Sequence, residues 1–242
     1  MKINVSIEAR MTSTRLPGKV LMPILGMPML ELQIRKVREA ELVNEIIVAT
    51  TKNAADDPII ELCERLGVRV YRGSEHDVLR RVIESHRACS SDLIVELTGD
   101  NPLQDPTLVD QCIKYFKEND FHYVSNCVPH REYPEGMNVQ VFPLSVLEEV
   151  GREALDSDFR EHVSLYIYKS GKYRIGYVGP QDRKLTRPEI SFTVDTKEEF
   201  EFVKGAAEHF SDTNFSLSQL ISVVDCDPKL RAFVDKARKV SK

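Results

Sequence analysis

Short runs of β-branched and apolar residues alternate with amphipathic stretches along the first half of the chain, and this alternation limits the possible folds more than any other feature. The expected strands are at 3–7, 45–51, 68–71, 92–97 and 122–126. The expected helices are at 28–40, 57–66, 78–89 and 107–118. Strands that alternate with helices pair in parallel, and the helices cover both faces of the sheet. The sequence therefore predicts an α/β fold with a mostly parallel sheet.

The second half departs from this rhythm. Segment 129–142 is expected to leave the sheet as a loop and to return as a short alternating strand at 138–142, followed by a helix. Further strands are expected at 174–178 and 189–194, and helices from 197 onward with breaks near 212 and 227. Because no internal repeat or long linker is visible, the whole chain, 1–242, is expected to form a single domain. Segment 129–142 would then be an excursion that contacts a substrate or a second copy.

Composition excludes several classes of protein. The 242 residues are 42% hydrophobic, which is enough to bury a core of this size. The formal net charge is -5 and cations are mixed with acids throughout, so a nucleic-acid partner is not expected. No segment is apolar enough for a signal peptide or a membrane span. The odd number of widely spaced cysteines favours free thiols and a cytoplasmic location. These cysteines are Cys63, Cys89, Cys112, Cys127 and Cys226.

The loop after the first expected strand is cationic. Arg10, Arg15 and Lys19 lie in segment 9–19, which contains no acid. Its small residues, which leave backbone amides accessible, are Thr12, Ser13, Thr14 and Gly18. Ligands of open α/β sheets bind at the carboxyl ends of strands, and cations with exposed amides suit a polyphosphate. The spacing does not match a P-loop, and a solvated surface loop explains the same residues equally well.

Two acids follow expected strands from distant parts of the chain. Asp100 follows the strand at 92–97 through Thr98 and Gly99, and Asp195 follows the strand at 189–194. Together they could hold Mg²⁺, which prefers oxygen ligands, while Gly99 would let a nucleotide approach. Each acid is also well placed to cap a turn or a helix. The competing metal ligands are Asp225 and Asp227.

Other polar groups are less specific. In segment 72–81, Ser74 and Asp77 are equally explained as caps of the following helix. His162 is expected to be a buried, hydrogen-bonded histidine rather than a general base. The cluster Tyr133, Glu135, Asn138 and Gln140 could form a polar substrate wall or a dimer arm. No Ser-His-Asp or Cys-His arrangement is evident, so covalent catalysis is not expected.

An ordered series of motifs resembles the cytidylyltransferase family. The motifs are EARMTSTRLPGKVL, GMPMLE, RGSEHDVLRR, ELTGDNPLQDPTLVD, YVSN, YPEGMNVQVF, REHVSLYI and FTVDTKEEF, and they extend over residues 3–202. Within the family the chain is most similar to the acylneuraminate cytidylyltransferase-like and spore-coat polysaccharide branch, which is related to CMP-Kdo synthetases. This resemblance implies a Rossmann-like mixed sheet of the nucleotidyltransferase (glycosyltransferase-A) type, with a small β excursion.

The resemblance also implies roles for individual residues. The nucleotide would be bound by Ala9, Arg10, Ser13, Arg15, Lys19, Gly73, Ser74, Asp77, Gly99 and Asp100. The catalytic groups among these would be Arg10, Arg15, Lys19 and Asp100. Asp100 and Asp195 would hold Mg²⁺, with Asp225 as the alternative second acid. The acceptor would be bound by Asn126, Tyr133, Asn138 and Gln140.

The acceptor side departs from the family pattern. Asn138 and Gln140 stand where many relatives of the branch carry carboxylates, and Asn101 stands where cysteine or another residue is frequent. Neutral amides keep hydrogen bonding but remove repulsion toward an anionic acceptor. Taken as a whole, the resemblance implies CMP transfer from CTP to a sugar acid or sugar phosphate, with release of pyrophosphate. A sialic-acid-like or Kdo-like sugar for surface polysaccharide or lipopolysaccharide, and a homodimer, are further expectations.

Three alternatives remain open at this point. The first is a nucleotidyltransferase that uses another nucleotide or a non-sugar phosphorylated acceptor. The second is a glycosyltransferase, because the same fold binds nucleotide sugars through a strand-end acid and a metal. The third is a nucleotide-binding regulator without catalytic activity.

Overall fold

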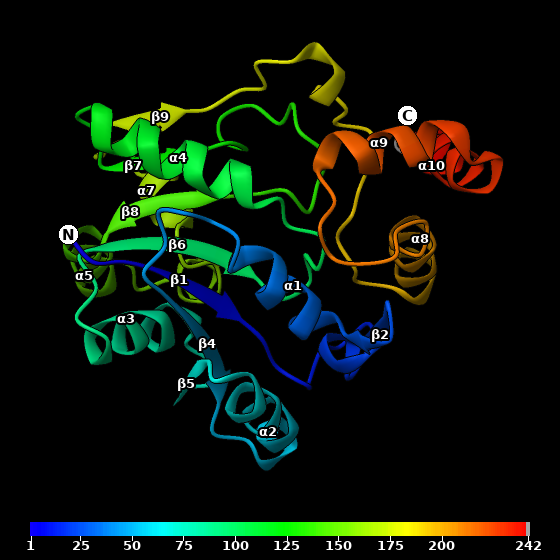
Figure 1. Cartoon of the computed structure of the whole chain (residues 1–242). Coiled ribbons are helices and arrows are strands. Elements are labelled where there is room, and N and C mark those ends of the chain that lie inside the picture. Colours follow the sequence, from blue (N-terminus) through cyan, green and yellow to red (C-terminus); the bar gives the residue numbers. More distant parts are fainter. Residues whose placement is uncertain (241–242) are drawn as a thin grey trace.

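The computed structural model describes residues 1–240, with side chains described through residue 237. Its main sheet has seven strands in the order β5-β4-β1-β6-β8-β7-β9 (Figure 1). These strands are β1 (Ile3–Glu8), β4 (Glu45–Thr51), β5 (Arg69–Gly73), β6 (Leu93–Thr98), β7 (Tyr123–Ser125), β8 (Gln140–Pro143) and β9 (Ile175–Tyr177). A separate antiparallel pair is formed by β2 (Pro23–Ile24) and β3 (Met27–Pro28).

The prediction of a mostly parallel sheet is confirmed. Strand β1 is central and pairs in parallel with β4 and β6, β5 extends the parallel half, and β7 pairs in parallel with β9. Strand β8 alone runs antiparallel to its neighbours β6 and β7. It comes from the end of the predicted excursion, so this segment returns to the sheet beside β6 and makes the sheet mixed.

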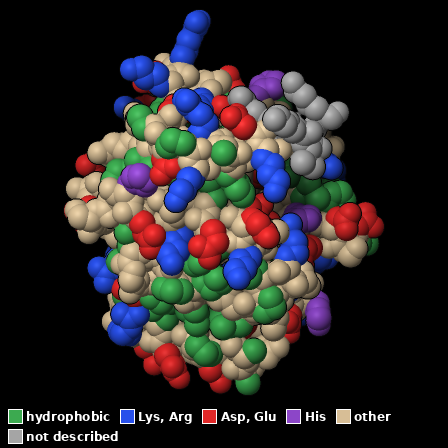
Figure 2. Space-filling view, turned by 90° about the vertical axis from the view of Figure 1, so that its right-hand side faces the viewer, with side chains coloured by type: hydrophobic (Ala, Val, Ile, Leu, Met, Phe, Trp, Pro, Cys, Tyr) green, Lys and Arg blue, Asp and Glu red, His purple; other side chains and the backbone are tan. Residues whose placement is uncertain are grey.

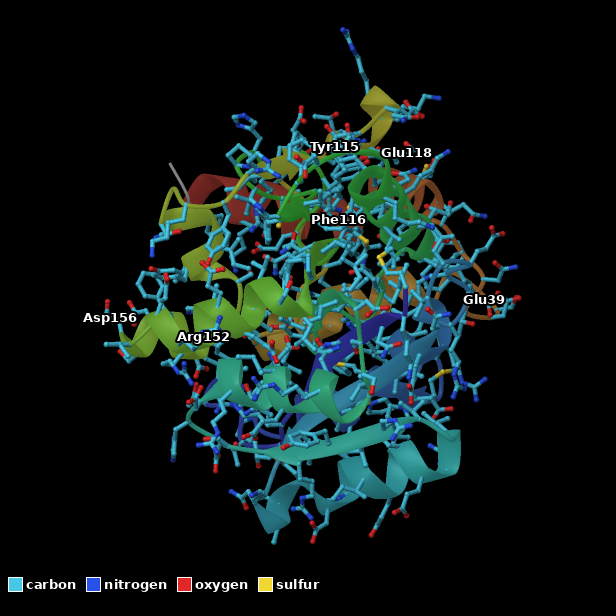
Figure 3. The ribbon with its side chains drawn as sticks, turned by 90° about the vertical axis from the view of Figure 1, so that its left-hand side faces the viewer. Glu39, Tyr115, Phe116, Glu118, Arg152 and Asp156 are labelled. Atoms are coloured by element: carbon cyan, nitrogen blue, oxygen red, sulfur yellow. The ribbon has the colours of Figure 1, made fainter. Side chains whose placement is uncertain are left out.

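Helices cover both faces of the sheet. The helices of the described chain are α1 (Met29–Val37), α2 (Asp57–Leu66), α3 (Val78–Ala88), α4 (Pro106–Glu118), α5 (Leu144–Glu153), α6 (Ser157–Glu161), α7 (Leu165–Lys169), α8 (Lys197–Ala207), α9 (Leu217–Cys226) and α10 (Pro228–Val240), of which the last three lie together beyond the ends of the strands (Figure 1). On β6, Leu93, Val95 and Leu97 join the core under α1 and α4, whereas Ile94 joins the core under α3 and α5. Figure 3 shows the end of α4, marked by Tyr115 and Glu118, well apart from the end of α5, marked by Arg152.

Several local signals act as the sequence predicts. Helix α2 has a proline in its first turn and ends at Gly67, which adopts the left-handed conformation with φ of 62°. None of the helices in the described part of the chain is long and apolar enough to cross a bilayer. All five cysteine thiols are free. Figure 2 shows acidic and basic side chains interspersed on the face that carries α8 and α10.

The predicted strand at 189–194 is wrong. Within the described chain this segment makes one isolated parallel bridge, between Glu135 and Ser191. Ile190, Phe192 and Val194 nevertheless point into the core, so the alternation in the sequence reflects burial and not pairing in the sheet. The Val194 N–H donates to the Asp100 carbonyl at 2.9 Å, which brings the segment to the end of β6.

Candidate active site

A cavity of about 390 Å³ opens at the carboxyl ends of β1 and β6. The loop after β1 forms one wall, and the start of α3 with residues 161–164 forms another. Asp195 closes the cavity on the side of α8. The lining residues are Glu8, Ala9, Arg10, Ser13, Thr14, Arg15, Lys19, Val20, Val78, Arg81, Glu96, Thr98, Gly99, Asp100, Gln140, Glu161, His162, Val163, Ser164 and Asp195. The strand ends and the cationic loop therefore meet at one site.

The loop after β1 is held by its own backbone. Gly18 adopts a left-handed conformation with φ of 74°, and its N–H donates to the Met11 carbonyl at 2.9 Å. The Met11 N–H in turn donates to the Asp56 carboxylate at 2.7 Å. This folding turns the chain into the short helix that starts at Lys19 and directs the Lys19 side chain inward, where it is nearly fully buried.

Lys19 joins the two strand-end acids. Its ammonium lies 2.8 Å from a carboxylate oxygen of Asp195 and 3.6 Å from one of Asp100. It also donates to the Val194 carbonyl at 2.7 Å. Arg15 pairs with the other oxygen of Asp195 at 2.7 Å. The site thus contains two carboxylates bridged by one ammonium, with a guanidinium on the outer side.

Asp195 is available for this cluster because a neighbour caps the helix. Thr196 and Glu199 form the capping box of α8, and the Glu199 carboxylate also accepts the Asp195 N–H at 2.9 Å. Thr196, and not Asp195, is therefore the residue that caps this helix. At the other acid, the Thr98 hydroxyl donates to Asp100 at 2.5 Å and fixes the carboxylate at the end of β6.

Asp225, the alternative second acid, lies elsewhere. Both of its carboxylate oxygens accept hydrogen bonds from Arg187, at 2.7 and 2.8 Å. Asp225 and Arg187 line a different cavity, which lies between residues 187–189 and helices α9 and α10. Of the two candidates, only Asp195 shares the cavity with Asp100.

The predicted nucleotide-binding residues divide into two groups. Those in the loop after β1 and at the end of β6 line the cavity, whereas Gly73, Ser74 and Asp77 are not among its lining residues. Asp77 accepts the Arg80 N–H at 2.9 Å as the cap of α3 and pairs with Arg160. A side chain at Gly73 would lie 2.7 Å from Arg81, so this glycine makes room for a residue that does line the cavity.

The predicted acceptor residues divide in the same way. Gln140 lines the cavity, but Asn126, Tyr133 and Asn138 are not among its lining residues. The Asn126 amide donates to the Met137 carbonyl and accepts from the Val139 N–H, both at 2.8 Å. Tyr133 is buried in the main core. Asn126 therefore holds segment 129–142 in place, and only Gln140 is positioned to contact a ligand in the cavity.

The expectation for His162 is wrong. This side chain is exposed at the end of α6 and lines the cavity. Helix α6 is only five residues long, so the sequence pattern that suggested a buried helical face does not continue through His162.

Sequence reasoning missed four charged residues of the cavity, which are Glu8, Arg81, Glu96 and Glu161. Glu8 and Glu96 lie within strands, and Arg81 lies on α3. Burial raises the pKa of Glu96 to about 7, while burial and repulsion from Glu96 raise the pKa of Glu8 well above its ordinary value. Burial lowers the pKa of the Arg81 guanidinium. The available signal was an acid inside an apolar strand, which rarely occurs without a ligand or a partner.

Replacing Glu96 by glutamine is expected to make stability less dependent on pH. Glutamate ionises near 4.5 in the unfolded chain, whereas the pKa of Glu96 in the folded protein is about 7. Between these values the folded protein keeps a proton that the unfolded chain has lost, so the free energy of unfolding falls as the pH rises, by about 3 kcal/mol at most. Glutamine cannot ionise, so the free energy of unfolding of the Glu96→Gln variant should fall less over the same range of pH. Urea unfolding at pH 5 and pH 8 measures this, and an identical pH dependence in both proteins would contradict it.

Comparison with known proteins agrees with this geometry. The family model described as cytidylyltransferase matches residues 5–220. The spore coat polysaccharide biosynthesis protein SpsF of Bacillus subtilis is 33% identical over 231 residues, covering 92% of this chain and 93% of that protein. A 3-deoxy-manno-octulosonate cytidylyltransferase of Geobacter metallireducens is 38% identical over 115 residues, which are 47% of this chain and 44% of that enzyme.

The solved structure of a cytidylyltransferase from Leptospira borgpetersenii is similar to the whole fold. Its TM-score is 0.90 at 30% identity, with 95% of this chain and 96% of that chain covered. The order of the mixed sheet, the cationic loop after its central strand β1 and this similarity together define the protein as a nucleotidyltransferase. More narrowly, the chain belongs to the cytidylyltransferase family.

Proposed function

We propose that this protein transfers CMP from CTP to a sugar acid and releases pyrophosphate. One observation carries the proposal: Arg15 and Lys19 meet Asp100 and Asp195 in the same cavity. Cations beside strand-end carboxylates suit a triphosphate with its metal ion. A sugar-acid acceptor is supported by the match with the 3-deoxy-manno-octulosonate cytidylyltransferase.

In the proposed reaction an oxygen of the acceptor attacks the α-phosphorus of CTP, and the bond from that phosphorus to the β-phosphate oxygen breaks. Arg10, Arg15 and Lys19 would stabilise the charge that grows on the leaving pyrophosphate. The loop after β1 fixes these cations before the substrate arrives, so positioning supplies part of the rate enhancement. No nucleophile from the protein is needed.

The residues present fit a magnesium ion that arrives with the nucleotide. Among the described residues, no group of three or more His, Cys, Asp or Glu side chains could hold a metal ion by itself. Mg²⁺ is commonly held by one or two carboxylates together with substrate phosphates, and Asp100 and Asp195 are such a pair. When bound, the ion would neutralise phosphate charge during the transfer. The Lys19 ammonium, which pairs with both carboxylates, supports the proposal of a cation at this position.

Pyrophosphate release from each of the four nucleoside triphosphates, measured with Mg²⁺ across a panel of keto-sugar acids and sugar phosphates, tests the proposal. We expect release that requires both CTP and a sugar acid. Release with another nucleotide, or with a phosphorylated acceptor that is not a sugar, would replace the proposed substrate. Transfer from a nucleotide sugar would favour a glycosyltransferase, and the absence of any turnover would favour a regulator.

We also propose that the reaction takes place in the cytoplasm, by a homodimer, and serves surface-glycan synthesis. The name of the Bacillus subtilis relative supports a polysaccharide pathway, and the five free thiols suit a reducing compartment. Segment 129–142 exposes residues 129–131 to solvent and is the proposed contact between copies. Light scattering of the purified protein would give its mass in solution.

A further inference from the structure

A row of polar side chains crosses three neighbouring strands beneath the cavity. In the sheet, Glu96 of β6 lies opposite Gln140 of β8, and Glu8 of β1 lies opposite Thr98, two residues along β6 from Glu96. Residues two apart on a strand point to the same face. Glu8, Glu96 and Gln140 all line the cavity. They form its floor on the face that is covered by α3.

The two carboxyl groups of this floor are incompletely hydrogen-bonded. One buried oxygen of Glu8 and one of Glu96 have no hydrogen-bond partner among the described residues. Glu96 as a whole residue is only 5% exposed. Buried polar atoms are almost always hydrogen-bonded, and an unpaired buried carboxyl group is costly. Because these atoms lie at a cavity, a bound molecule can supply the missing donors.

Charge around the floor favours a cation over an anion. Arg81 is 2% exposed, its charge favours the ionised form of Glu8, and it donates one hydrogen bond to the Ser74 carbonyl. Arg10, at the mouth, is 3.5 Å from Glu161. The other titratable groups that line the cavity are Arg15, Lys19, Asp100, His162 and Asp195. When both carboxyl groups are ionised, two carboxylates and one guanidinium leave one negative charge at the floor, which an ammonium balances and a hydroxyl group does not.

Gln140 is oriented by its neighbours. Its side-chain carbonyl accepts hydrogen bonds from the Ser164 hydroxyl at 2.6 Å and from the Tyr123 hydroxyl at 2.5 Å. This leaves the amide nitrogen of Gln140 to donate to an oxygen of a ligand. The floor therefore presents acceptors at Glu8 and Glu96 beside a donor at Gln140.

We propose that the acceptor carries a protonated primary amine that binds between Glu8 and Glu96, and that it is an amino-substituted sugar acid. The inference rests on the proposed function and specifies its substrate class. The ammonium supplies three N–H donors and balances the charge of the floor, while Gln140 holds a neighbouring hydroxyl oxygen. An acceptor whose carboxylate faced this floor would be repelled.

Matched acceptors test the inference. Sugar acids that differ at one carbon, with an amine, a hydroxyl or an acetamido group, are compared by kcat/KM at saturating CTP. We expect the amine to exceed its hydroxyl twin by about tenfold or more, as for other polar contacts that leave a site unpaired when absent. Glu96→Gln should remove this preference and leave the KM for CTP unchanged. Glu148→Gln, at a partly exposed acid of α5 paired with Arg87 and outside the cavity, is the matched control and should keep the preference.

Calorimetry gives an independent readout. With a non-hydrolysable CTP analogue bound, the amine-bearing acceptor should bind more tightly than its hydroxyl counterpart and release protons, because an ammonium favours the ionised form of two carboxyl groups whose pKa values are otherwise raised. Titrations in buffers of different ionisation enthalpy measure those protons. If Glu96→Gln fails to fold, Glu8→Gln provides the same comparison.

Equal use of the amine and hydroxyl twins, or a preference that survives in Glu96→Gln, would overturn the inference and leave CMP transfer intact. Failure of the proposed function differs, because the CTP analogue would then not bind. If the CTP analogue binds but neither the amine-bearing nor the hydroxyl-bearing sugar acid is turned over, equal affinities for these two acceptors in calorimetry would also overturn the inference.

Discussion

Replacing Asp100 by asparagine is expected to lower kcat by about 10²- to 10³-fold, the loss typical of removing one group that stabilises transition-state charge. The carboxylate lies at the end of β6, 3.6 Å from the Lys19 ammonium, and is the proposed ligand for Mg²⁺. Asparagine keeps the size of the side chain and can still accept the hydrogen bond from Thr98. The melting temperature should therefore change little. Steady-state pyrophosphate release and thermal unfolding measure the two quantities.

Asp225→Asn is the matched control for this variant. Asp225 pairs with Arg187 in a different cavity, so its replacement should leave kcat within about twofold of wild type, as expected for a site away from the reaction. A near-normal rate for Asp100→Asn would remove Asp100 from the proposed metal site. A large loss for Asp225→Asn would assign the second acid there in place of Asp195.

Lys19→Met is expected to have two opposite effects. It should lower kcat/KM for CTP by about 10²-fold, because the triphosphate loses a buried cation. It should also tighten Mn²⁺ binding in the absence of nucleotide, because Asp100 and Asp195 no longer pair with an ammonium. In the wild type, the triphosphate offers Lys19 a new partner and thereby frees the two carboxylates. Metal and CTP should therefore bind cooperatively, each raising the affinity for the other by the same factor.

Titration of Mn²⁺, followed by electron paramagnetic resonance with and without a non-hydrolysable CTP analogue, measures this coupling. Lys184→Met, at an exposed position of the turn Arg183–Leu185, is the control and should preserve it. Unchanged metal affinity in Lys19→Met would show that the ammonium does not compete for the two carboxylates.

Much of the fold could be predicted because strands and helices leave different periods in the sequence. Strand β4 has the predicted bounds, and β1 and β6 differ from prediction by a residue or two. The segment at 189–194 has the alternation of a strand without the pairing, since three of its residues pack into the core while its backbone bonds mainly to loops. Alternation reports which side chains are buried, whereas pairing depends on neighbours distant in the sequence.

The site was predictable to the extent that it follows strand ends. Asp100 and the cationic loop were located from that rule, and the cavity contains both. Residue type alone misled for Asn126, whose amide is fully used by the backbone of segment 129–142. Glu8 and Glu96 were missed because only the register of β1 against β6 places them as diagonal neighbours on one face of the sheet. That register is a long-range property and is not visible in either strand by itself.

The bridge that Lys19 makes between Asp100 and Asp195 also bears on how the protein matures. Zinc fingers and similar domains need their ion in order to fold, because the free energy of metal binding supplies their folding free energy. Here the chain supplies its own counterion, and the two carboxylates are neutralised as soon as the loop after β1 meets the segment before α8. Folding is thereby separated from metal supply. A cell short of magnesium would accumulate an intact protein that becomes competent when the ion and the nucleotide arrive together.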